Sequence, residues 1–476
     1  MSDAVIRAGS SQFCKAKLVT IMNQEVYDMG FQKDFIWGAA SAAYQLEGAY
    51  NEDGKGLSIW DVYAGNHGNT RYNEDGKTAC DHYHRVDEDI ALMVELGIPY
   101  YRFSISWPRV IPEGTGTVND KGLQFYSDLV DKLIANGIEP IVTLYHWDYP
   151  YALHRKGAWL NDDSPEWFLE YTKVIVDALS DRVKYWVTIN EPQCVLGCGY
   201  LGGFHAPFAH AQIVDLLKMG RNILLSHGKA AGYIRKNAKK KPVIGFTPIG
   251  PSYVPENDSK EAIEEAKRKT FSIGGEEFPF SLSYWSDPVF LGHYPEELYD
   301  QFGVMVPEFN EEEIKIITEP LDFYGTNIYY SQADKVEEGY PENRYQGSPE
   351  THVGWVMSPE VMYWSAKFLY ERYGKPILIT ENGMAEHDWV CLDGKVHDSY
   401  RIDYTHRYLK EFMRAGEEGV PLMGYLHWSL MDNYEWAEGY TQRFGLIYVD
   451  YLTQERIIKD SGYWYKDVIA TNGENL

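Results

Sequence analysis

Cysteine and long apolar runs are both scarce in this chain. Five cysteines occur among 476 residues, an odd number without the spacing of a disulfide framework, so the sequence predicts reduced thiols in a cytoplasmic protein. No stretch approaches the roughly eighteen apolar residues that a membrane span requires, and a soluble protein is therefore expected. Residues 1–30 also lack the continuous apolar core of a secretory signal, and we expect them to form a flexible N-terminal extension.

Positive charge is in short supply as well. Lys and Arg number 44 against 70 Asp and Glu, which gives a net charge of −26 at pH 7. Such a surface repels phosphate backbones and anionic lipids. Neither nucleic acid nor a membrane is therefore expected as a partner.

The chain has few signs of a metal or cofactor site. Cys194 and Cys198, with His205 and His210 further on, are the residues that could suggest zinc. They form no CxxC pair, and there is no HExxH helix. We therefore expect no metal ion and no cofactor.

Aromatic residues, in contrast, are abundant. They make up 15% of the chain, with 38 Tyr and 14 Trp. Most should pack in the core, but an excess of this size also suits sugar binding, because the apolar face of a pyranose stacks on flat rings.

Eight short runs with strand character recur, with amphipathic stretches between them. The strand-like runs are residues 35–39, 100–105, 138–144, 185–189, 243–246, 323–326, 377–380 and 423–427. Helical patterns, with apolar residues at steps of three and four, include 87–96, 122–136, 165–178, 361–373 and 401–417. These alternations predict an α/β fold, a single-domain (β/α)8 TIM barrel with long loops after the strands, and we place the catalytic domain at residues 31–470.

Two connections are longer than a minimal barrel needs, residues 49–84 and 250–320. Both are polar and aromatic, and we expect them to form loops that line the pocket. The acidic run 261–269 within the second is predicted to be a solvated helix.

Two glutamates end strand-like runs far apart in the sequence, in Thr188-Ile189-Asn190-Glu191-Pro192 and Ile379-Thr380-Glu381-Asn382-Gly383. Either one alone could equally cap a helix or pair with an arginine. A barrel, however, brings the carboxyl ends of its strands onto one face, where its chemistry takes place. Two converging carboxylates are typical of glycoside hydrolysis.

Other polar and aromatic groups follow the remaining strands and should converge on the same face. They are Gln45 and Glu47 after the first strand, Arg102 in the second, His146 and Trp147 after the third, Asn190 beside Glu191, Asn327 and Tyr329 after the sixth, and Trp428, Glu435 and Trp436 after the eighth.

At these residues the chain resembles glycoside hydrolase family 1, the β-glucosidase family. Besides the two glutamate motifs, the matches are Tyr44-Gln45-Leu46-Glu47-Gly48, Tyr101-Arg102-Phe103-Ser104-Ile105-Ser106-Trp107-Pro108-Arg109, Tyr145-His146-Trp147-Asp148, Trp428-Ser429-Leu430 and Asn433-Tyr434-Glu435-Trp436-Ala437. The resemblance runs from about residue 31 to about residue 465. It implies a retaining β-glucosidase that removes the terminal non-reducing β-D-glucosyl residue from short oligosaccharides or from aryl and alkyl glucosides, with the small-molecule β-glycoside as its partner.

The resemblance also implies a role for each residue. Glu381 would be the nucleophile and Glu191 the acid/base, with carboxyls about 5–5.5 Å apart. Arg102 and Tyr329 would hold Glu381, although Arg102 could also serve as a structural ion pair. Asn190 would bind the sugar 2-hydroxyl. The remaining substrate-binding residues would be Gln45, His146, Trp147, Asn327, Trp428, Glu435, Trp436 and Phe444; taken alone, His146 would fit a buried core histidine better.

The residues facing the sugar 6-position point to an unphosphorylated substrate. Family members that act on 6-phosphorylated sugars carry Ser, Lys and Tyr where this chain has Glu435, Thr441 and Arg443, and a carboxylate there would repel phosphate. A non-catalytic sugar-binding protein on the same barrel is a rival interpretation, as is a metal-dependent hydrolase. The sequence leaves open the choice among gluco, galacto and fuco sugars and whether the protein is a homo-oligomer.

Overall fold

The computed structural model describes residues 31–249, 252–332 and 346–476. The predicted N-terminal extension, residues 1–30, lies outside the described residues. Among the helices of the described part, none is both long and apolar enough to cross a membrane.

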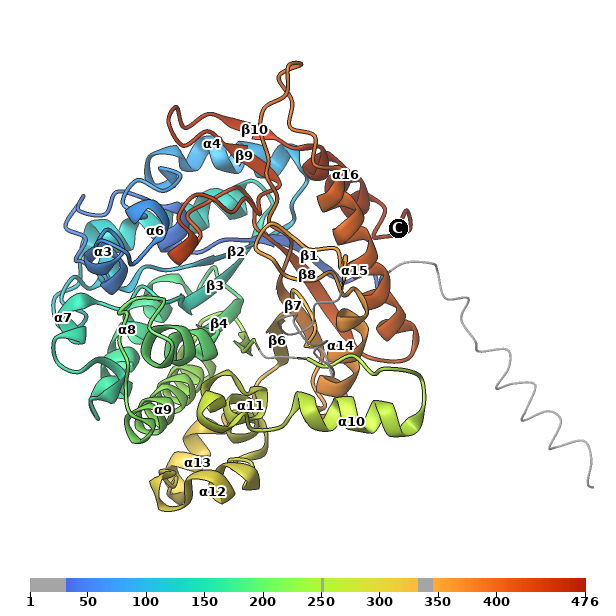
Figure 1. Cartoon of the computed structure of the whole chain (residues 1–476). Helices are drawn as coiled ribbons and strands as arrows, with labels where there is room; N and C mark the ends of the chain where they lie inside the picture. The colour runs from blue at the N-terminus through green and yellow to red at the C-terminus, as the bar shows by residue number, and fades with distance from the viewer. Residues whose placement is uncertain (1–30, 250–251, 333–345) are drawn as a thin grey trace, which may run out of the picture.

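Eight parallel strands close into a barrel at the centre of the molecule (Figure 1). Each strand pairs with its neighbours in chain order, and β8 pairs with β1 to close the ring. The strands are β1 (Ile36–Ala40), β2 (Tyr100–Ser104), β3 (Glu139–Tyr145), β4 (Tyr185–Asn190), β5 (Val243–Thr247), β6 (Phe323–Asn327), β7 (Ile377–Asn382) and β8 (Leu422–Trp428). The predicted TIM barrel is therefore confirmed, with every strand within two residues of its predicted limits.

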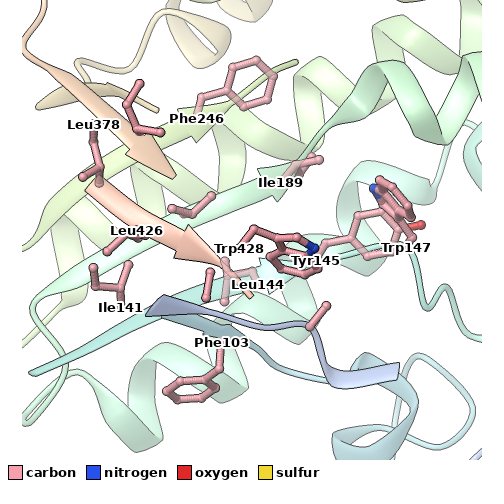
Figure 2. Packing of buried hydrophobic residues seen from close by; sticks show 14 of the residues in the cluster. Phe103, Ile141, Leu144, Tyr145, Trp147, Ile189, Phe246, Leu378, Leu426 and Trp428 are labelled. Carbon is pink, nitrogen blue, oxygen red and sulfur yellow. The ribbon is translucent and has the colours of Figure 1, made fainter. Parts of the chain in front are cut away.

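The strands are buried on both faces, as a barrel inside a ring of helices requires. Every residue of β4 and of β7 is buried. Figure 2 shows Ile141, Leu378 and Leu426 among the strands, with Trp147 and Trp428 where β3 and β8 end. Continuous apolar runs fit this environment, which is why the strands could be recognised in the sequence.

Helices return the chain between consecutive strands and surround the barrel (Figure 1). The longer ones are α4 (His82–Glu95), α6 (Asp120–Ala135), α8 (Ser164–Leu179), α9 (Ile213–Asn237), α14 (Glu360–Tyr373), α15 (Ser399–Glu417) and α16 (Asp460–Ala470). In α6 the buried residues Tyr126, Leu129, Val130 and Leu133 recur at steps of three and four, so that one stripe faces the barrel. The five helices that the sequence predicted are confirmed.

The expectation of a loop over residues 250–320 was wrong. In its described part this connection carries α10 (Lys260–Thr270), η4 (Gly275–Phe280), α11 (Leu282–Leu291), α12 (Glu296–Phe302), η5 (Gly303–Met305) and α13 (Glu311–Ile317). These helices are short, and local caps help to define them: Asn310 forms a capping box with Glu313 at the start of α13. The acidic run 261–269 does lie in a helix, α10, with Glu261, Glu264 and Arg268 exposed and Ala266 buried.

The first long connection, residues 49–84, contains only α3 (Ile59–Tyr63), η1 (Arg71–Asn73) and the start of α4. The other short elements are α2 (Ala43–Leu46), α5 (Trp107–Val110), α7 (Tyr151–His154), η2 (Ala158–Leu160), the π-helical η3 (Cys194–Leu201) and η6 (Trp436–Glu438). After β8, the strands β9 (Ile447–Val449) and β10 (Arg456–Ile458) form a small antiparallel sheet.

Candidate active site

The carboxyl ends of the barrel strands bring the predicted site residues together. Asn190 is the last residue of β4, Glu381 is the next to last residue of β7, and Trp428 is the last residue of β8. The pairing register shifts close to Asn190, Asn327 and Glu381. Irregularities of this kind re-aim side chains at the rim of a barrel.

Glu381 is buried and held by two donors. Arg102 Nη1 lies 2.6 Å from Oε1, and the Tyr329 hydroxyl donates to Oε2 over 2.9 Å. Burial raises the pKa of Glu381, while the Arg102 cation and these hydrogen bonds oppose the rise. The guanidinium therefore favours the ionised form of this carboxyl.

Glu191 is also buried, but its partners are neutral. Asn327 Nδ2 donates to Oε1 over 2.5 Å, and the Cys194 thiol donates to Oε2 over 3.1 Å. Burial, and then the negative charge of Glu381, raise the pKa of Glu191 to about 7. This carboxyl can therefore carry a proton near neutral pH.

Arg102 connects the two carboxyls through a shared network. Besides Glu381, it donates to Asn190 Oδ1 over 2.6 Å and to Thr143 Oγ1 over 3.0 Å. Asn327 Nδ2, which contacts Glu191, also lies 3.2 Å from Asn190 Oδ1. Arg102 therefore forms a buried ion pair with Glu381, and its role in holding Glu381 for catalysis stays a prediction.

His146 lies next to Asn190. Asn190 Oδ1 already accepts from Arg102, so its amide nitrogen is the donor to His146 Nε2, at 3.1 Å. The histidine must then carry its proton on Nδ1, a buried atom with no partner among the described residues. Burial and the Arg102 charge lower the pKa of His146 well below its usual value, which keeps the ring neutral. Its free N–H is available to a substrate hydroxyl.

The tryptophans form one wall of the site. The rings of Trp147 and Trp436 lie 4.6 Å apart, and the Trp428 ring lies 5.9 Å from that of His146. Trp147 Nε1 donates to the Asn190 carbonyl over 3.0 Å, so the indole N–H is engaged with the backbone. Trp147 contributes its ring face.

Three site residues have a left-handed backbone although they carry side chains. The φ angles are 76° for Trp147, 44° for Glu191 and 49° for Trp436. Such conformations are costly and concentrate where function requires a side chain to point in one direction.

Gln45 and Glu435 lie side by side. Gln45 Nε2 donates to Glu435 Oε2 over 3.1 Å and to the Tyr434 carbonyl over 2.9 Å, while its Oε1 is buried without a partner among the described residues. Burial, followed by the charges of Glu381 and Glu191, raises the pKa of Glu435 to about 8. The pair offers a free amide oxygen and a carboxyl to a polar ligand.

The segment that carries Glu435 and Trp436 is anchored by buried charges. Asp432 lies 2.6 Å from Arg443 Nη1 and 2.6 Å from Lys459 Nζ, and Lys459 also lies 2.5 Å from Asp388. Asp388 contacts Arg401, which pairs with Asp398 as well. The charges of three cations, Arg401, Arg443 and Lys459, thus balance those of three carboxylates, Asp388, Asp398 and Asp432.

One residue of the predicted set does not join the site. The Glu47 carboxylate instead accepts from Arg109 Nε over 2.8 Å and from the Tyr126 hydroxyl over 2.5 Å. It links the segment after β1 to α5 and α6, so the expectation that Glu47 converges with the others was wrong. Helix α2 turns successive side chains in different directions, and Gln45 faces the site whereas Glu47 does not.

Phe444 is buried beside Tyr329, with ring centroids 6.3 Å apart. Trp355, which the sequence analysis missed, lies 4.9 Å from the Tyr329 ring and 6.0 Å from that of Phe444. It belongs to the long connection between β6 and α14, outside every motif. Its only signal in the sequence is that it is a tryptophan in the long connection that follows Asn327 and Tyr329.

Gly383 allows the strand that carries Glu381 to approach β8. A Cβ at this position would collide with the carbonyl oxygen of Trp428. The last position of the second glutamate motif therefore requires glycine for a steric reason. The peptide bond from Trp428 to Ser429 is cis.

Within the described residues, no three His, Cys, Asp or Glu side chains are placed to hold a metal ion. The site instead offers two buried carboxyls, one held by a cation and the other by neutral donors, with polar and aromatic groups around them. Such a pair can supply a nucleophile and a proton donor to one bond.

Comparison with known proteins gives matches along nearly the whole chain. The family model described as Glycosyl hydrolase family 1 matches residues 27–474. Beta-glucosidase A of Acetivibrio thermocellus is 46% identical over 456 residues, which cover 93% of this chain and 99% of that protein. Beta-glucosidase A of Thermotoga maritima is 42% identical over 447 residues, which cover 93% of this chain and 98% of that protein.

Solved structures agree with the sequence matches. The family 1 b-glucosidase from Thermotoga maritima superposes with a TM-score of 0.85 at 42% identity, covering 94% of this chain and 99% of that chain. The beta-glucosidase from the same organism in complex with deoxynojirimycin gives a TM-score of 0.86 at 42% identity, with the same coverage.

Proposed function

The chain belongs to glycosyl hydrolase family 1, and on that premise we propose that it is a retaining β-glucosidase. Its substrates would be short β-linked oligosaccharides and aryl or alkyl β-glucosides, from which it would remove the terminal non-reducing glucosyl residue. The proposal is supported by the carboxyl pair and by relatives named beta-glucosidase.

One observation carries the assignment of roles. Arg102 contacts Glu381, whereas the hydrogen-bond partners of Glu191 are neutral. When two close carboxyls share one proton, the charge stays on the one that faces the cation. Glu381 is then the ionised nucleophile, and Glu191 is the acid.

In the first step, a Glu381 oxygen forms a bond to the anomeric carbon while the bond to the leaving oxygen breaks. Glu191 gives its proton to that oxygen, and the aglycone departs as an alcohol. Glu381 is now an ester and has lost its charge. The charge that helped to raise the pKa of Glu191 has gone, so its carboxylate becomes stable enough to act as a base.

In the second step, a water molecule attacks the anomeric carbon from the side that the aglycone left. Glu191 takes a proton from the water, and the bond to Glu381 breaks to restore the free carboxylate. The two inversions together retain the β configuration. The expected carboxyl separation of about 5–5.5 Å, which leaves no room for a water on the Glu381 side, stays a prediction.

The remaining groups would bind the sugar. Asn190 has one amide hydrogen left after its bond to His146, and we assign it to the 2-hydroxyl. His146 Nδ1 and Gln45 Oε1, both without a partner among the described residues, would take other hydroxyls. Trp428 would support the ring face, while Trp147, Asn327, Trp436 and Phe444 would complete the pocket.

Glu435 would accept from the hydroxyls at positions 4 and 6, and these donors would favour its ionised form. The positive charge of Arg443 is already offset by a carboxylate, because its Nη1 lies 2.6 Å from Asp432 and also donates to the Val449 carbonyl over 3.0 Å. Thr441 donates to the Glu438 carbonyl. These contacts support an unphosphorylated substrate.

We also propose that residues 31–470 form the catalytic domain and that the enzyme acts in the cytoplasm. The four cysteines of the described residues, Cys80, Cys194, Cys198 and Cys391, are free thiols, which suits a reducing compartment.

Two variants with added azide test the proposal. Glu381→Gly should lose hydrolysis by at least about a thousandfold, and azide should restore turnover of an activated aryl glucoside as the α-glucosyl azide. Glu191→Ala should still be glycosylated by that substrate, because a good leaving group needs no acid, and azide should give the β-glucosyl azide. The reverse pattern of anomers would overturn the roles. Absence of β-glucosidase activity in the unaltered enzyme would overturn the function.

A further inference from the structure

The oxygen of Glu191 that faces Cys194 is the one that must carry the catalytic proton. Oε1 accepts from Asn327 Nδ2 over 2.5 Å. The Asn327 amide oxygen accepts from the Thr380 hydroxyl, so the group facing Oε1 can only donate. A proton on Oε1 would face another proton, and the acid form of Glu191 is therefore protonated on Oε2.

Among the described residues, the Cys194 thiol is the hydrogen-bond partner of that oxygen, at 3.1 Å. The backbone fixes its position, because the Cys194 N–H donates to the Glu191 carbonyl over 3.0 Å and η3 begins at Cys194. The thiol thus lies one turn beyond the carboxyl that it contacts.

The sulfur is suited to both protonation states of Glu191. The neighbouring Cys198 thiol, then burial and the Glu191 charge, raise the pKa of Cys194 well above its usual value, so the group remains a thiol. A thiol is a weak donor and a weak acceptor. It can donate to the carboxylate and can accept from the protonated form, without holding either strongly.

We propose that Cys194 is a positioning residue that orients Oε2 of Glu191 and sets how readily this oxygen releases and takes up its proton. The inference rests on the proposed role of Glu191 as acid/base. A hydroxyl in place of the thiol would stabilise the carboxylate more, and an alkyl group would stabilise it less.

Other titratable groups act on Glu191 from the surrounding strands and loops. Glu381 on β7 raises its pKa and Arg102 on β2 lowers it. Tyr329 and Glu435 also interact electrostatically with Glu191, and Cys198 acts on Cys194 from the next turn of η3. Substitution at Cys194 leaves all five groups in place, so its effect on proton release can be measured separately.

The test is the pH dependence of kcat/KM for an aryl β-glucoside with a poor leaving group, for which the acid is required. Cys194→Ser should move the midpoint of the alkaline limb to lower pH by about half a pH unit, which is about a threefold loss at high pH. Cys194→Ala and Cys194→Val should move the midpoint to higher pH. Cys391→Ser, the same change in the loop after β7, is the matched control and should leave the midpoint unchanged.

Opposite displacements of the midpoint for the Ser variant and for the two alkyl variants support the proposal. A general loss of packing would move the midpoint in the same direction in all three variants. Displacements in the same direction, or none in variants with unaltered circular dichroism and KM, would overturn it. Failure of the proposed function is distinguishable, since it would appear in the azide products of the Glu191 and Glu381 variants, in which Cys194 is unchanged.

Discussion

Replacing Glu191 by Gln should change how the stability of the protein depends on pH. The carboxyl is buried, and its pKa is raised to about 7, whereas an exposed Glu in the unfolded chain has a pKa near 4.3. The folded state therefore holds a proton on Glu191 that the unfolded state releases between these two values. Stability from this group is fully present below about pH 4.3 and is lost as the pH rises to about 7.

The size of the effect follows from the difference in pKa. Each pKa unit corresponds to about 1.4 kcal/mol, so Glu191 costs the unaltered enzyme up to about 4 kcal/mol above pH 7. Glutamine cannot ionise, and it imitates the protonated acid: its oxygen can accept from Asn327 while its amide faces Cys194. The variant should therefore gain up to about 4 kcal/mol in unfolding free energy, relative to the unaltered enzyme, between pH 4.5 and pH 8.

Denaturant unfolding of both proteins across this range is the assay. All other titrating groups are shared, so the difference between the two curves reports Glu191 together with its electrostatic effect on Glu381 and Glu435. Glu261→Gln, an exposed position on α10, serves as the control and should give a curve parallel to that of the unaltered enzyme. Parallel curves for Glu191→Gln as well would refute the conclusion that burial and Glu381 keep this carboxyl protonated.

Three further changes have defined outcomes. Tyr329→Phe removes one hydrogen bond to the Glu381 carboxylate, so kcat/KM should fall about ten- to a hundredfold. The acidic limb of the pH profile of kcat/KM should also move to higher pH, and an unchanged limb would contradict the contact. Lys459→Met leaves Asp388 and Asp432 with one cation each and should cost about 3 kcal/mol of stability in denaturant unfolding. Asp388→Asn should restore part of this loss, and no loss of stability in Lys459→Met would count against the buried network. Glu435→Ser should lower kcat/KM for the plain glucoside, at about 1.5–3 kcal/mol per lost hydrogen bond, and should reduce the discrimination against the 6-phosphoglucoside. Equal turnover of both substrates by the unaltered enzyme would contradict the role of Glu435.

The barrel could be predicted because its strands are buried on both faces and read as continuous apolar runs between turn residues. The same argument placed Glu191 and Glu381 at strand ends. It could not predict the helices between Gly275 and Ile317, because short helices on the surface depend on caps and on neighbouring segments more than on a long periodic pattern.

The contacts within the site were harder to predict than its members. Nothing in the sequence shows that Asn327 bridges Asn190 and Glu191, or that Glu47 turns away to Arg109, because these contacts join residues far apart in the chain. Cys194 was weighed as a zinc ligand, although its thiol contacts the acid carboxyl. The register shifts in β4 and β7 re-aim side chains by amounts that only the folded barrel defines.

The most direct test of the central claim is the configuration of the sugar as it is first released. Proton NMR during hydrolysis of an aryl β-glucoside by the unaltered enzyme would follow both anomeric signals before mutarotation mixes them. Nucleophilic attack by Glu381, followed by attack of water with Glu191 as the base, predicts that β-glucose forms first and α-glucose only later. Release of α-glucose first would mean that water attacks the substrate directly, and it would contradict the assignment of Glu381 as the nucleophile.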